Sequence, residues 1–510
     1  MKKYTWVIVI ALLVGGVLLL SKDMRSAPAK KVLKVGYPGY WNDLVPSLQH
    51  TAFADAIMYN QYEALVGEGP GGTIAPVAAK SWEISEDKKT IVFKIDTSKK
   101  FSNGEVLTAQ HFKDSWEHGL SLDPKSANSS LLDAMYKTKD FESFKKTGSL
   151  AGVKVLDNET LSVEFKKPFR MALSYLSGTR MSAFVREGEK YLGTGPYIIN
   201  PDGENKIRLV RNPHSAVDAS FDEVTVEVVK TDNAEEALKS GQIDLYAFAE
   251  LANLKICYEK TKNVGCQSGS ESRHINMKLN GMKGRFFSNP KYRKALQYLL
   301  SVELKESYPS SEKFKTRLDP QIYLPFQAGR IDNEEAQNIV NEGKEYVEEF
   351  LAATKKNPIF LASSRKDPWF KNWLLEKGVH LTKTSVRIPG KKVYEMNYKT
   401  FEPDLLFSHT SVSNGDPDGI YHALGKNGAI STPMVQRENV MKLLEEGRGL
   451  YDMEDIKEHY KKVSRAALEE VPFFHFGFLK TVVAYRTDRL KIKKKYKHRD
   501  DNRFIAYEAL

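Results

Sequence analysis

The sequence has very little cysteine and almost no long apolar runs, and both shortages restrict what the chain can be. Only two cysteines, Cys257 and Cys266, occur in 510 residues, which excludes a disulfide-rich scaffold and a zinc-finger array. The one apolar run long enough to enter a bilayer extends from Tyr4 to Leu20, which excludes a polytopic membrane protein. With 41% hydrophobic and 28% charged residues, the composition is that of a globular chain. At about 150 residues per domain, this length predicts two to four domains.

Signatures of catalysis and of nucleotide binding are also missing. The sequence contains no G-x-S-x-G, H-E-x-x-H or Walker A motif. Gly67-x-Gly69-x-x-Gly72 matches the dinucleotide fingerprint in letters, but Pro70 interrupts it and no helix pattern follows, so we interpret it as a turn. His475 lies in an aromatic strand pattern and is expected to be a core or cleft histidine and not a base. We therefore expect no enzyme, no catalytic residue, no cofactor and no metal site.

Positive charge is concentrated at the two ends of the chain. Of the net charge of +11, the leader through Ala29 carries +3 and the segment from Arg486 to Arg503 carries +6, so the body between them is nearly neutral. No helix-turn-helix, RNP or zinc-finger pattern accompanies the basic segment. We expect no nucleic-acid partner and interpret this segment as a solvated terminus.

The N-terminus has the layout of an export signal. Lys2 and Lys3 precede the apolar run, and Ala27-Pro28-Ala29 follows it. Proline makes this a poor cleavage site, so residues 1–30 are either a cleaved signal or an uncleaved membrane anchor. No cysteine follows the apolar run directly, which excludes a lipoprotein anchor and favours a Gram-negative periplasm.

An oxidising compartment also bears on the two cysteines. Cys257 and Cys266 are expected to form one short-loop disulfide there, with two buried thiols as the alternative.

Hydrophobic periodicity alternates between strand and helix patterns along the whole chain. Strand patterns are found at 32–36 and 473–478, in hairpins at 81–95, 153–165 and 197–210, and in a βαβ unit from 224 to 245 whose helix is expected to be capped by Thr231 or Asp232. Helix patterns are found at 54–66, 290–300, 334–353, 371–377, 438–446 and 455–469. This mixture of hairpins and βαβ units predicts an α/β protein with two lobes.

An ordered set of motifs then resembles one family closely. The motifs are Ile74-Ala75-Pro76-Val77-Ala78-Ala79-Lys80-Ser81-Trp82-Glu83-Ile84, Phe101-Ser102-Asn103-Gly104-Glu105, Gly193-Thr194-Gly195-Pro196-Tyr197, Arg211-Asn212-Pro213, Ala237-Leu238-Lys239-Ser240-Gly241-Gln242-Ile243-Asp244, Asn289-Pro290-Lys291-Tyr292-Arg293 and Asn414-Gly415-Asp416-Pro417-Asp418. In this order they resemble the family 5 extracellular solute-binding proteins, the oligopeptide-, dipeptide- and nickel-binding components of ABC transporters.

The resemblance implies a two-lobed periplasmic binding protein-like fold of type II, cluster C, with an extra domain II and a discontinuous domain I. After the leader at 1–30, it divides the chain into domain I at 31–67, 192–262 and 475–510, domain II at 68–191, and domain III at 263–474. It also implies a monomeric periplasmic protein that captures a peptide or another small polar solute by hinge closure. The implied partner is an ABC transporter permease in the inner membrane.

By position in the family, two segments are expected to face the ligand. They are His50, Thr51 and Ala52 on domain I, and Ser411, Val412, Ser413 and Asn414 on domain III. Arg365, Lys391 and Lys392 fall near regions that contact the carboxyl end of the peptide in relatives.

One departure from the family pattern concerns the ligand directly. Peptide binders place an aspartate that pairs with the ligand's α-ammonium where this chain has Ser413, and a tryptophan near the position of Thr410. A neutral serine cannot supply the charge-assisted bond that a desolvated ammonium needs. Asp404, Asp416 and Asp418 are possible substitutes, although the last two are better suited to the turn around Pro417.

A non-transport function is the alternative interpretation. In it, an uncleaved leader holds a sensor or scaffold in the membrane, and the basic C-terminal segment recognises a partner.

Overall fold

The structure is a computed structural model of the 510-residue chain. It describes residues 30–39, 41, 44–48, 52–68, 73–122, 138–250, 254–257, 259, 261–304, 318–324, 327–363, 370–382, 386–387, 403–411, 416–426, 428, 431–493 and 504–510. The leader and the most basic stretch of the C-terminal segment therefore lie outside the described residues. Among the described residues, no helix combines the length and apolar character needed to cross a membrane.

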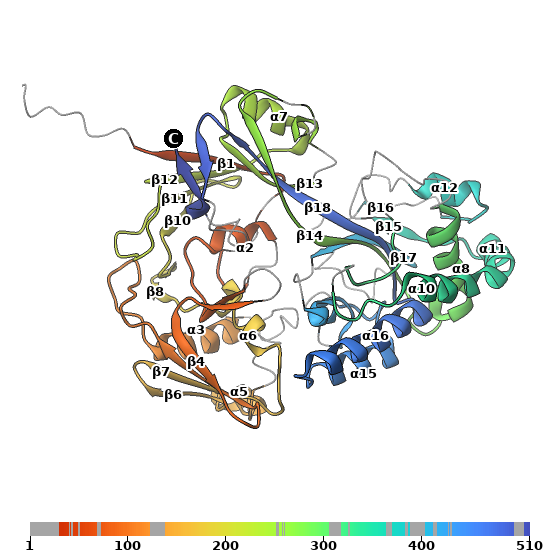
Figure 1. The fold of residues 1–510 in the computed structure, drawn as a ribbon, viewed down its shortest axis with the longest axis horizontal. Coiled ribbons are helices and arrows are strands. Elements are labelled where there is room, and N and C mark those ends of the chain that lie inside the picture. Colours follow the sequence, from red (N-terminus) through yellow and green to blue (C-terminus); the bar gives the residue numbers. More distant parts are fainter. Residues whose placement is uncertain are drawn as a thin grey trace, which may run out of the picture.

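One mixed sheet of ten strands extends across the molecule (Figure 1). In spatial order its strands are β10 (Tyr197–Pro201), β11 (Lys206–Arg211), β12 (Glu223–Val228), β1 (Val32–Tyr37), β13 (Leu245–Glu250), β18 (Phe473–Arg486), β14 (Val264–Leu279), β17 (Leu405–Ser411), β15 (Leu361–Ser363) and β16 (Val386–Arg387). We call the part that contains β1 and β10–β13 the first lobe, and the part that contains β15–β17 the second lobe.

Two long strands connect the lobes. β14 and β18 pair antiparallel from Val264 opposite Arg486 to Lys278 opposite Phe473, so both run from one lobe into the other. The register shifts between Ser268 and Arg273, and again between Ile275 and Asn276. β-Bulges bend a strand and increase its twist, so these irregularities lie where two strands must change direction between lobes.

The first lobe also holds a separate four-stranded antiparallel sheet. Its order is β4 (Ala79–Ile84), β5 (Thr90–Ile95), β7 (Thr160–Glu164) and β6 (Val153–Asp157). Helix α3 (Ala109–Leu122) buries Phe112 and Trp116 in this region's core, and the Trp116 indole N–H donates to Met181 O at 2.9 Å. The remaining elements of this lobe are β2 (Val66–Glu68), β3 (Ile74–Pro76), α5 (Phe141–Thr147), α6 (Ala172–Tyr175), β8 (Val185–Glu187), β9 (Lys190–Leu192), α7 (Thr231–Ser240), β19 (Leu490–Ile492) and β20 (Tyr507–Ala509).

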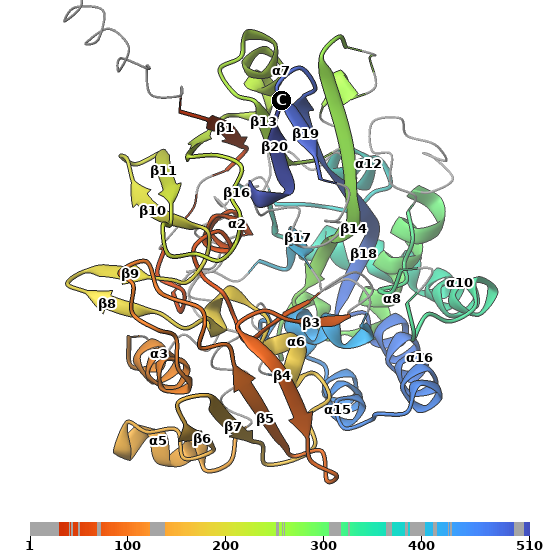
Figure 2. The same cartoon turned by 60° about the vertical axis from the view of Figure 1, so that its left-hand side comes forward.

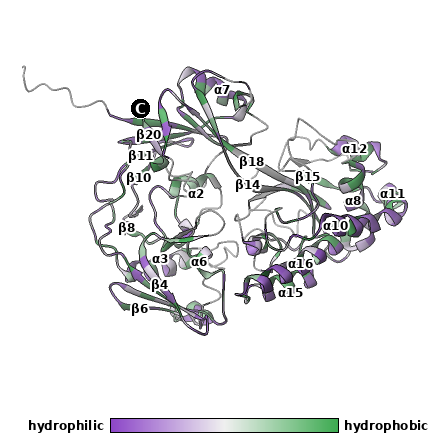
Figure 3. Ribbon diagram, in the orientation of Figure 1, coloured by the Kyte–Doolittle hydropathy of each residue, from purple (hydrophilic) through white to green (hydrophobic). Residues whose placement is uncertain are grey.

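Helices cover the second lobe. They are α8 (Pro290–Tyr298), α10 (Asn333–Asn341), α11 (Val347–Lys356), α12 (Phe370–Glu376), α14 (Tyr421–Leu424), α15 (Glu438–Gly447) and α16 (Met453–Glu470) (Figure 2). In α16, Ile456, Tyr460, Val463 and Ala467 are buried at helical spacing, which seats one face on the core. Hydrophilic residues are prominent along α10, α15 and α16 in Figure 3, as expected for helices that are exposed on one side.

Apolar cores divide along the chain. One buried cluster is drawn entirely from residues 65–183, and three others are drawn from residues 275–476. A further cluster combines residues 33–57 and 197–247 with Leu490 and residues 504–507, so distant parts of the chain share one core. Each cluster therefore stabilises a separate region of the fold.

Most predicted strands are present, and three helix predictions were wrong in detail. The predicted helix at 54–66 is α2 (Ala52–Met58), which ends early because the Asn60 side-chain amide donates to Ala56 O at 2.8 Å. The predicted helix at 334–353 is broken by the 3-10 segment η7 (Glu342–Tyr346), where a Cβ on Gly343 would lie 2.2 Å from Lys294 O. Helix α7 begins at Thr231 itself and has no side-chain cap.

Cys257 and Cys266 form a disulfide, with their Cα atoms 5.6 Å apart. The bond joins the 3-10 segment η4 (Lys255–Cys257) to the N-terminal end of β14. It lies in the first lobe, close to where the chain enters the connecting strands.

Candidate ligand-binding site between the lobes

Of the predicted ligand-facing residues, only Ala52 and Ser411 lie among the residues that the structure describes. His50, Thr51, Arg365, Lys391, Lys392, Val412, Ser413 and Asn414 lie outside the described residues. Ala52 is the first residue of α2, and Ser411 is the last residue of β17. Figures 1 and 2 show α2 on the side of the first lobe that faces β14 and β17, so the two elements that carry Ala52 and Ser411 lie beside the junction between the lobes.

A buried polar layer lies in the strands that lead to this junction. Asn276 of β14 is opposite both Ser408 of β17 and His475 of β18 in the sheet register, and the Ser408 hydroxyl donates to Asn276 Oδ1 at 2.9 Å. His475 is 1% exposed, and burial lowers its pKa to about 4, so the ring is neutral at neutral pH. A neutral ring with its proton on Nδ1 donates to Asp319 O at 2.8 Å. His475 is therefore a buried structural histidine.

Lys278 lies two residues further along β14. Its side chain is 6% exposed, and burial lowers its pKa to about 8. An ammonium group in such a place is costly, so this part of β14 is polar to an unusual degree for the interior of a sheet.

The three aspartates considered as substitutes at the ammonium-binding position all have protein partners. Asp404 accepts the Phe360 N–H at 2.9 Å, and burial raises its pKa. Asp416 accepts the Asp418 N–H at 2.8 Å, which caps the 3-10 segment η8 (Pro417–Ile420), and it also pairs with Arg170. Asp418 accepts from the Tyr460 hydroxyl at 2.9 Å and from Arg448 Nε at 3.0 Å. All three carboxylates therefore already have hydrogen-bonding or ionic partners within the protein.

Opposite η8, the first lobe presents a short segment just before and within α6. Arg170 reaches Asp416 with two bonds, one of them from Nη2 to Oδ1 at 3.1 Å. Tyr175 accepts a hydrogen bond from Arg448 and stacks on the His422 ring, with centroids 5.3 Å apart. The lobes therefore touch through charged and aromatic groups.

Sequence reasoning missed these contact residues. Arg170 and Asp416 are 246 positions apart, and no local pattern links them. Only Asp416 lies in a motif, and the role predicted for it there was in the turn around Pro417.

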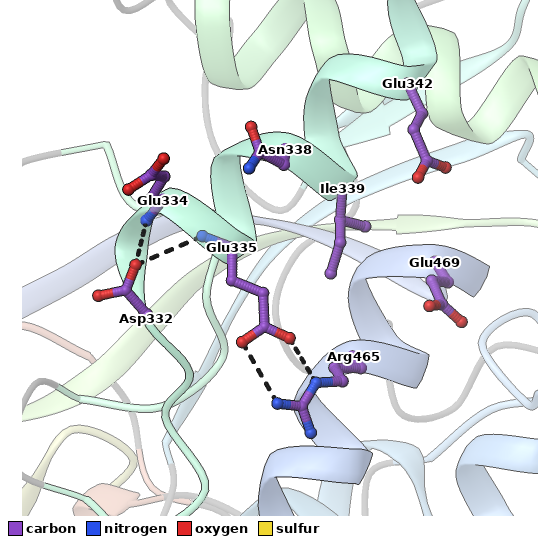
Figure 4. Close-up of a pocket in the computed structure, with 8 residues that line it drawn as sticks. All are labelled: Asp332, Glu334, Glu335, Asn338, Ile339, Glu342, Arg465 and Glu469. Carbon is purple, nitrogen blue, oxygen red and sulfur yellow. Dashed lines mark hydrogen bonds and ion pairs between the residues drawn. The ribbon is translucent and has the colours of Figure 1, made fainter.

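A surface hollow lies elsewhere, in the second lobe between α10 and α16 (Figure 4). It has a volume of about 500 Å³ and is lined by Asp332, Glu334, Glu335, Asn338, Ile339, Glu342, Arg465 and Glu469. Its one cation, Arg465, already bonds Glu335, with Nε 2.5 Å from Oε1. The hollow is acidic and none of the residues that line it is a predicted ligand contact, so it is not the predicted site. Within the part of the chain that the structure describes, no group of His, Cys, Asp and Glu side chains is arranged to hold a metal ion.

Comparisons with known proteins identify the family. The sequence model of the bacterial extracellular solute-binding proteins, family 5, matches residues 73–304. The dipeptide-binding protein DppE of Bacillus subtilis is 24% identical over 302 residues, which cover 56% of this chain and 54% of that protein. The sequence match thus spans about half the length of this curated relative.

Solved structures show the same fold over nearly the whole chain. The ABC transporter-associated periplasmic binding protein DppA from Helicobacter pylori, in complex with the peptide STSA, matches with a TM-score of 0.75 and 18% identity over 94% of this chain and 98% of that one. The binding protein AgaA from A. tumefaciens R10, in complex with agropinic acid, matches with a TM-score of 0.76 and 16% identity over 94% and 99%. Both are two-lobed α/β binding proteins in fold, as predicted here. Over residues 73–304 the chain matches family 5 of the bacterial extracellular solute-binding proteins, and its fold is that of the two binding proteins above.

Proposed function

We propose that this protein is the periplasmic solute-binding component of an ABC importer and that it captures a peptide or another small polar solute between its lobes. The observation that carries the proposal is the pair of long strands, β14 and β18, as the connection between two lobes of a family 5 fold. A ligand that contacts both lobes stabilises the closed arrangement by its differential affinity for that state. Delivery to a permease in the inner membrane then follows without turnover.

The ligand class is constrained by chemistry at the predicted site. DppE is named for dipeptides and the H. pylori structure holds a tetrapeptide, whereas AgaA holds agropinic acid. Ser413 replaces the carboxylate that peptide binders use, and Asp404, Asp416 and Asp418 have partners of their own. We therefore favour a peptide-like or opine-like solute for which a free α-ammonium is not the main determinant.

The domain division is part of the proposal. Domain II at 68–191 is supported by a core drawn from residues 65–183, and domain III at 263–474 by cores drawn from 275–476. The shared core of residues 33–57, 197–247 and 504–507 supports a domain I assembled from three pieces.

The expected ligand contacts remain predictions. They are His50, Thr51 and Ala52 on one side, and Ser411, Val412, Ser413 and Asn414 with Arg365 on the other. Export by the N-terminal leader is equally a prediction, and sequencing the mature N-terminus tests cleavage near Ala29.

A thermal-shift panel tests the function. Peptides with free and with acetylated N-termini, opines and metal chelates are each titrated into the purified protein. A bound solute stabilises the folded protein by RT ln(1 + [L]/Kd), so the melting temperature rises with solute concentration. If no solute in the panel raises the melting temperature, the transport proposal fails.

A matched variant sharpens the panel. Ser413→Asp restores the carboxylate, so it should bind free-amino peptides more tightly than their acetylated forms by about tenfold, which corresponds to the strength of a charge-assisted bond. The natural protein should discriminate much less between the two forms.

A further inference from the structure

We infer that Arg170 and Arg448 are positioning residues that hold the two lobes together before any solute binds. We call the residues concerned the interlobe clasp: Phe169, Arg170 and Tyr175 of the first lobe, with Asp416, His422 and Arg448 of the second. The inference rests on the proposed function, because the clasp can affect solute binding only if the lobes close when a solute binds. The contacts that form the clasp are all between residues of this chain.

The ionic half of the clasp crosses between the lobes. Arg170 and Asp416 form a bidentate pair whose side chains are only 13% and 22% exposed. Bidentate guanidinium–carboxylate pairs combine two charge-assisted bonds with a fixed orientation, and partial burial protects them from screening by salt. The Arg170 N–H also donates to Arg448 O at 3.2 Å, so the backbones of the two lobes meet at this point.

The aromatic half is built around Arg448. Its side chain is 3% exposed and its guanidinium carbon lies 3.5 Å from the Tyr421 ring centroid, while Phe169 and Tyr175 of the other lobe lie 5.1 and 5.2 Å away. Burial alone would lower the pKa of Arg448, but the adjacent Asp418 carboxylate outweighs it and raises the pKa, so the group stays charged. Opening the lobes would remove two of the three rings and the Tyr175 hydroxyl from a cation that has been buried among them.

The place of the clasp links it to the binding site. Asp416 begins the described chain directly after 412–415, the segment in which three of the proposed ligand contacts lie. The Asp416 carboxylate both forms the ion pair with Arg170 and accepts the Asp418 N–H that caps η8. The clasp therefore holds Asp416, the residue that follows the predicted ligand-contacting segment in the chain, against the first lobe, and it reduces the part of the binding free energy that a solute must use for closure.

The test measures the distance between the lobes in the ligand-free protein. Spin labels are placed on cysteines introduced at Leu156 in β6 and Leu375 in α12, which are 59% and 46% exposed, and the two native cysteines are already bonded to each other. Unfolding in guanidinium, dialysis and refolding remove any solute before pulsed EPR. We expect one short-distance population in the parent protein and a ratio of closed to open molecules about tenfold lower in Asp416→Asn and in Arg170→Gln.

The variants and a control separate closure from stability. The amide introduced by Asp416→Asn would keep an oxygen for the η8 cap, so this change removes the charge with little effect on folding. Arg330→Gln breaks a pair of similar exposure, 14% and 18%, that lies wholly within the second lobe. It should lower the melting temperature without changing the distance distribution. Unchanged distances in both clasp variants, or an open parent protein, would overturn the inference.

The two proposals fail in different ways. A stripped protein that is closed and opens in Asp416→Asn, yet binds no solute in the panel, rejects the proposed function and leaves the clasp standing. If the protein binds a solute but its ligand-free distances do not respond to Asp416→Asn, the clasp is rejected and the proposed function stands.

Discussion

At the residue scale, the motifs that resemble the family serve the scaffold. Thr194 donates to Glu63 Oε2 at 2.8 Å. The Asn212 amide donates to Gly195 O at 2.8 Å, so the motif at 211–213 is bonded directly to the motif at 193–197. Asn289 caps α8, and Asp416 caps η8. Such contacts depend on backbone geometry and not on the ligand, which is why the motifs predict the fold well and the solute poorly.

Gly193 gives a direct test of this structural role. A Cβ at this position would lie 2.0 Å from Gln61 O, a backbone atom that cannot move aside. Gly193→Ala should therefore lower the free energy of unfolding by about 3 kcal/mol through overpacking. Gly178→Ala is the control, because its Cβ would meet nothing closer than Tyr175 O at 3.8 Å in an ordinary extended conformation. Equal melting temperatures for the two variants would contradict the assignment.

His475 gives a pH-dependent prediction. Its pKa is about 4 in the folded protein, below its value of 6.5 in the unfolded chain, so between these values the unfolded chain binds a proton that the folded protein does not. Stability from His475 is thus fully present above pH 6.5 and decreases as the pH falls toward 4, by about 3 kcal/mol in total. His475→Gln lacks this contribution. Urea unfolding of both proteins at pH 7 and pH 4 should show a stability difference that changes by this amount, and a constant difference would refute it.

At the scale of elements, local patterns predicted strands and hairpins better than helix limits. The hairpins β4–β5, β6–β7 and β10–β11 form as predicted, and β5 and β11 bury alternate residues, as the sequence pattern implies. Helix α2 is shorter than its apolar pattern because a side chain beyond it bonds its last carbonyls, and η7 interrupts a helix where Gly343 packs against the backbone of α8. The packing of Gly343 depends on a tertiary neighbour that a local window does not contain, whereas Asn60 lies only four residues from Ala56 and ends α2 by a local side-chain bond that the apolar pattern does not register.

The disulfide is an element-scale device that can be removed. Cys257 and Cys266 are nine positions apart, and closing so short a loop restricts the unfolded chain by about 2–3 kcal/mol in the chain-entropy model. The double variant Cys257→Ser with Cys266→Ser should be less stable by this amount in urea. Dithiothreitol should lower the stability of the natural protein similarly and leave the double variant unchanged. A reductant effect on the double variant would contradict the account.

At the scale of the whole molecule, the sequence allowed the fold class and family to be predicted, but not the contacts between lobes. Arg170, Tyr175 and Arg448 come together only because β14 and β18 bring the lobes side by side, and nothing in their local sequence marks them. The absence of a carboxylate at Ser413 could be seen from the sequence, whereas the engagement of Asp404, Asp416 and Asp418 within the protein needed the structure.

The central claim is that this family 5 protein holds one small solute per chain without converting it. Native mass spectrometry of the protein purified from its own cells tests this most directly. The account predicts a 1:1 complex with one class of small polar solute, whose mass is unchanged after release and which rebinds to the refolded chain. A protein that carries no solute, and that binds none of the peptides, opines or metal chelates offered to it, would contradict the account.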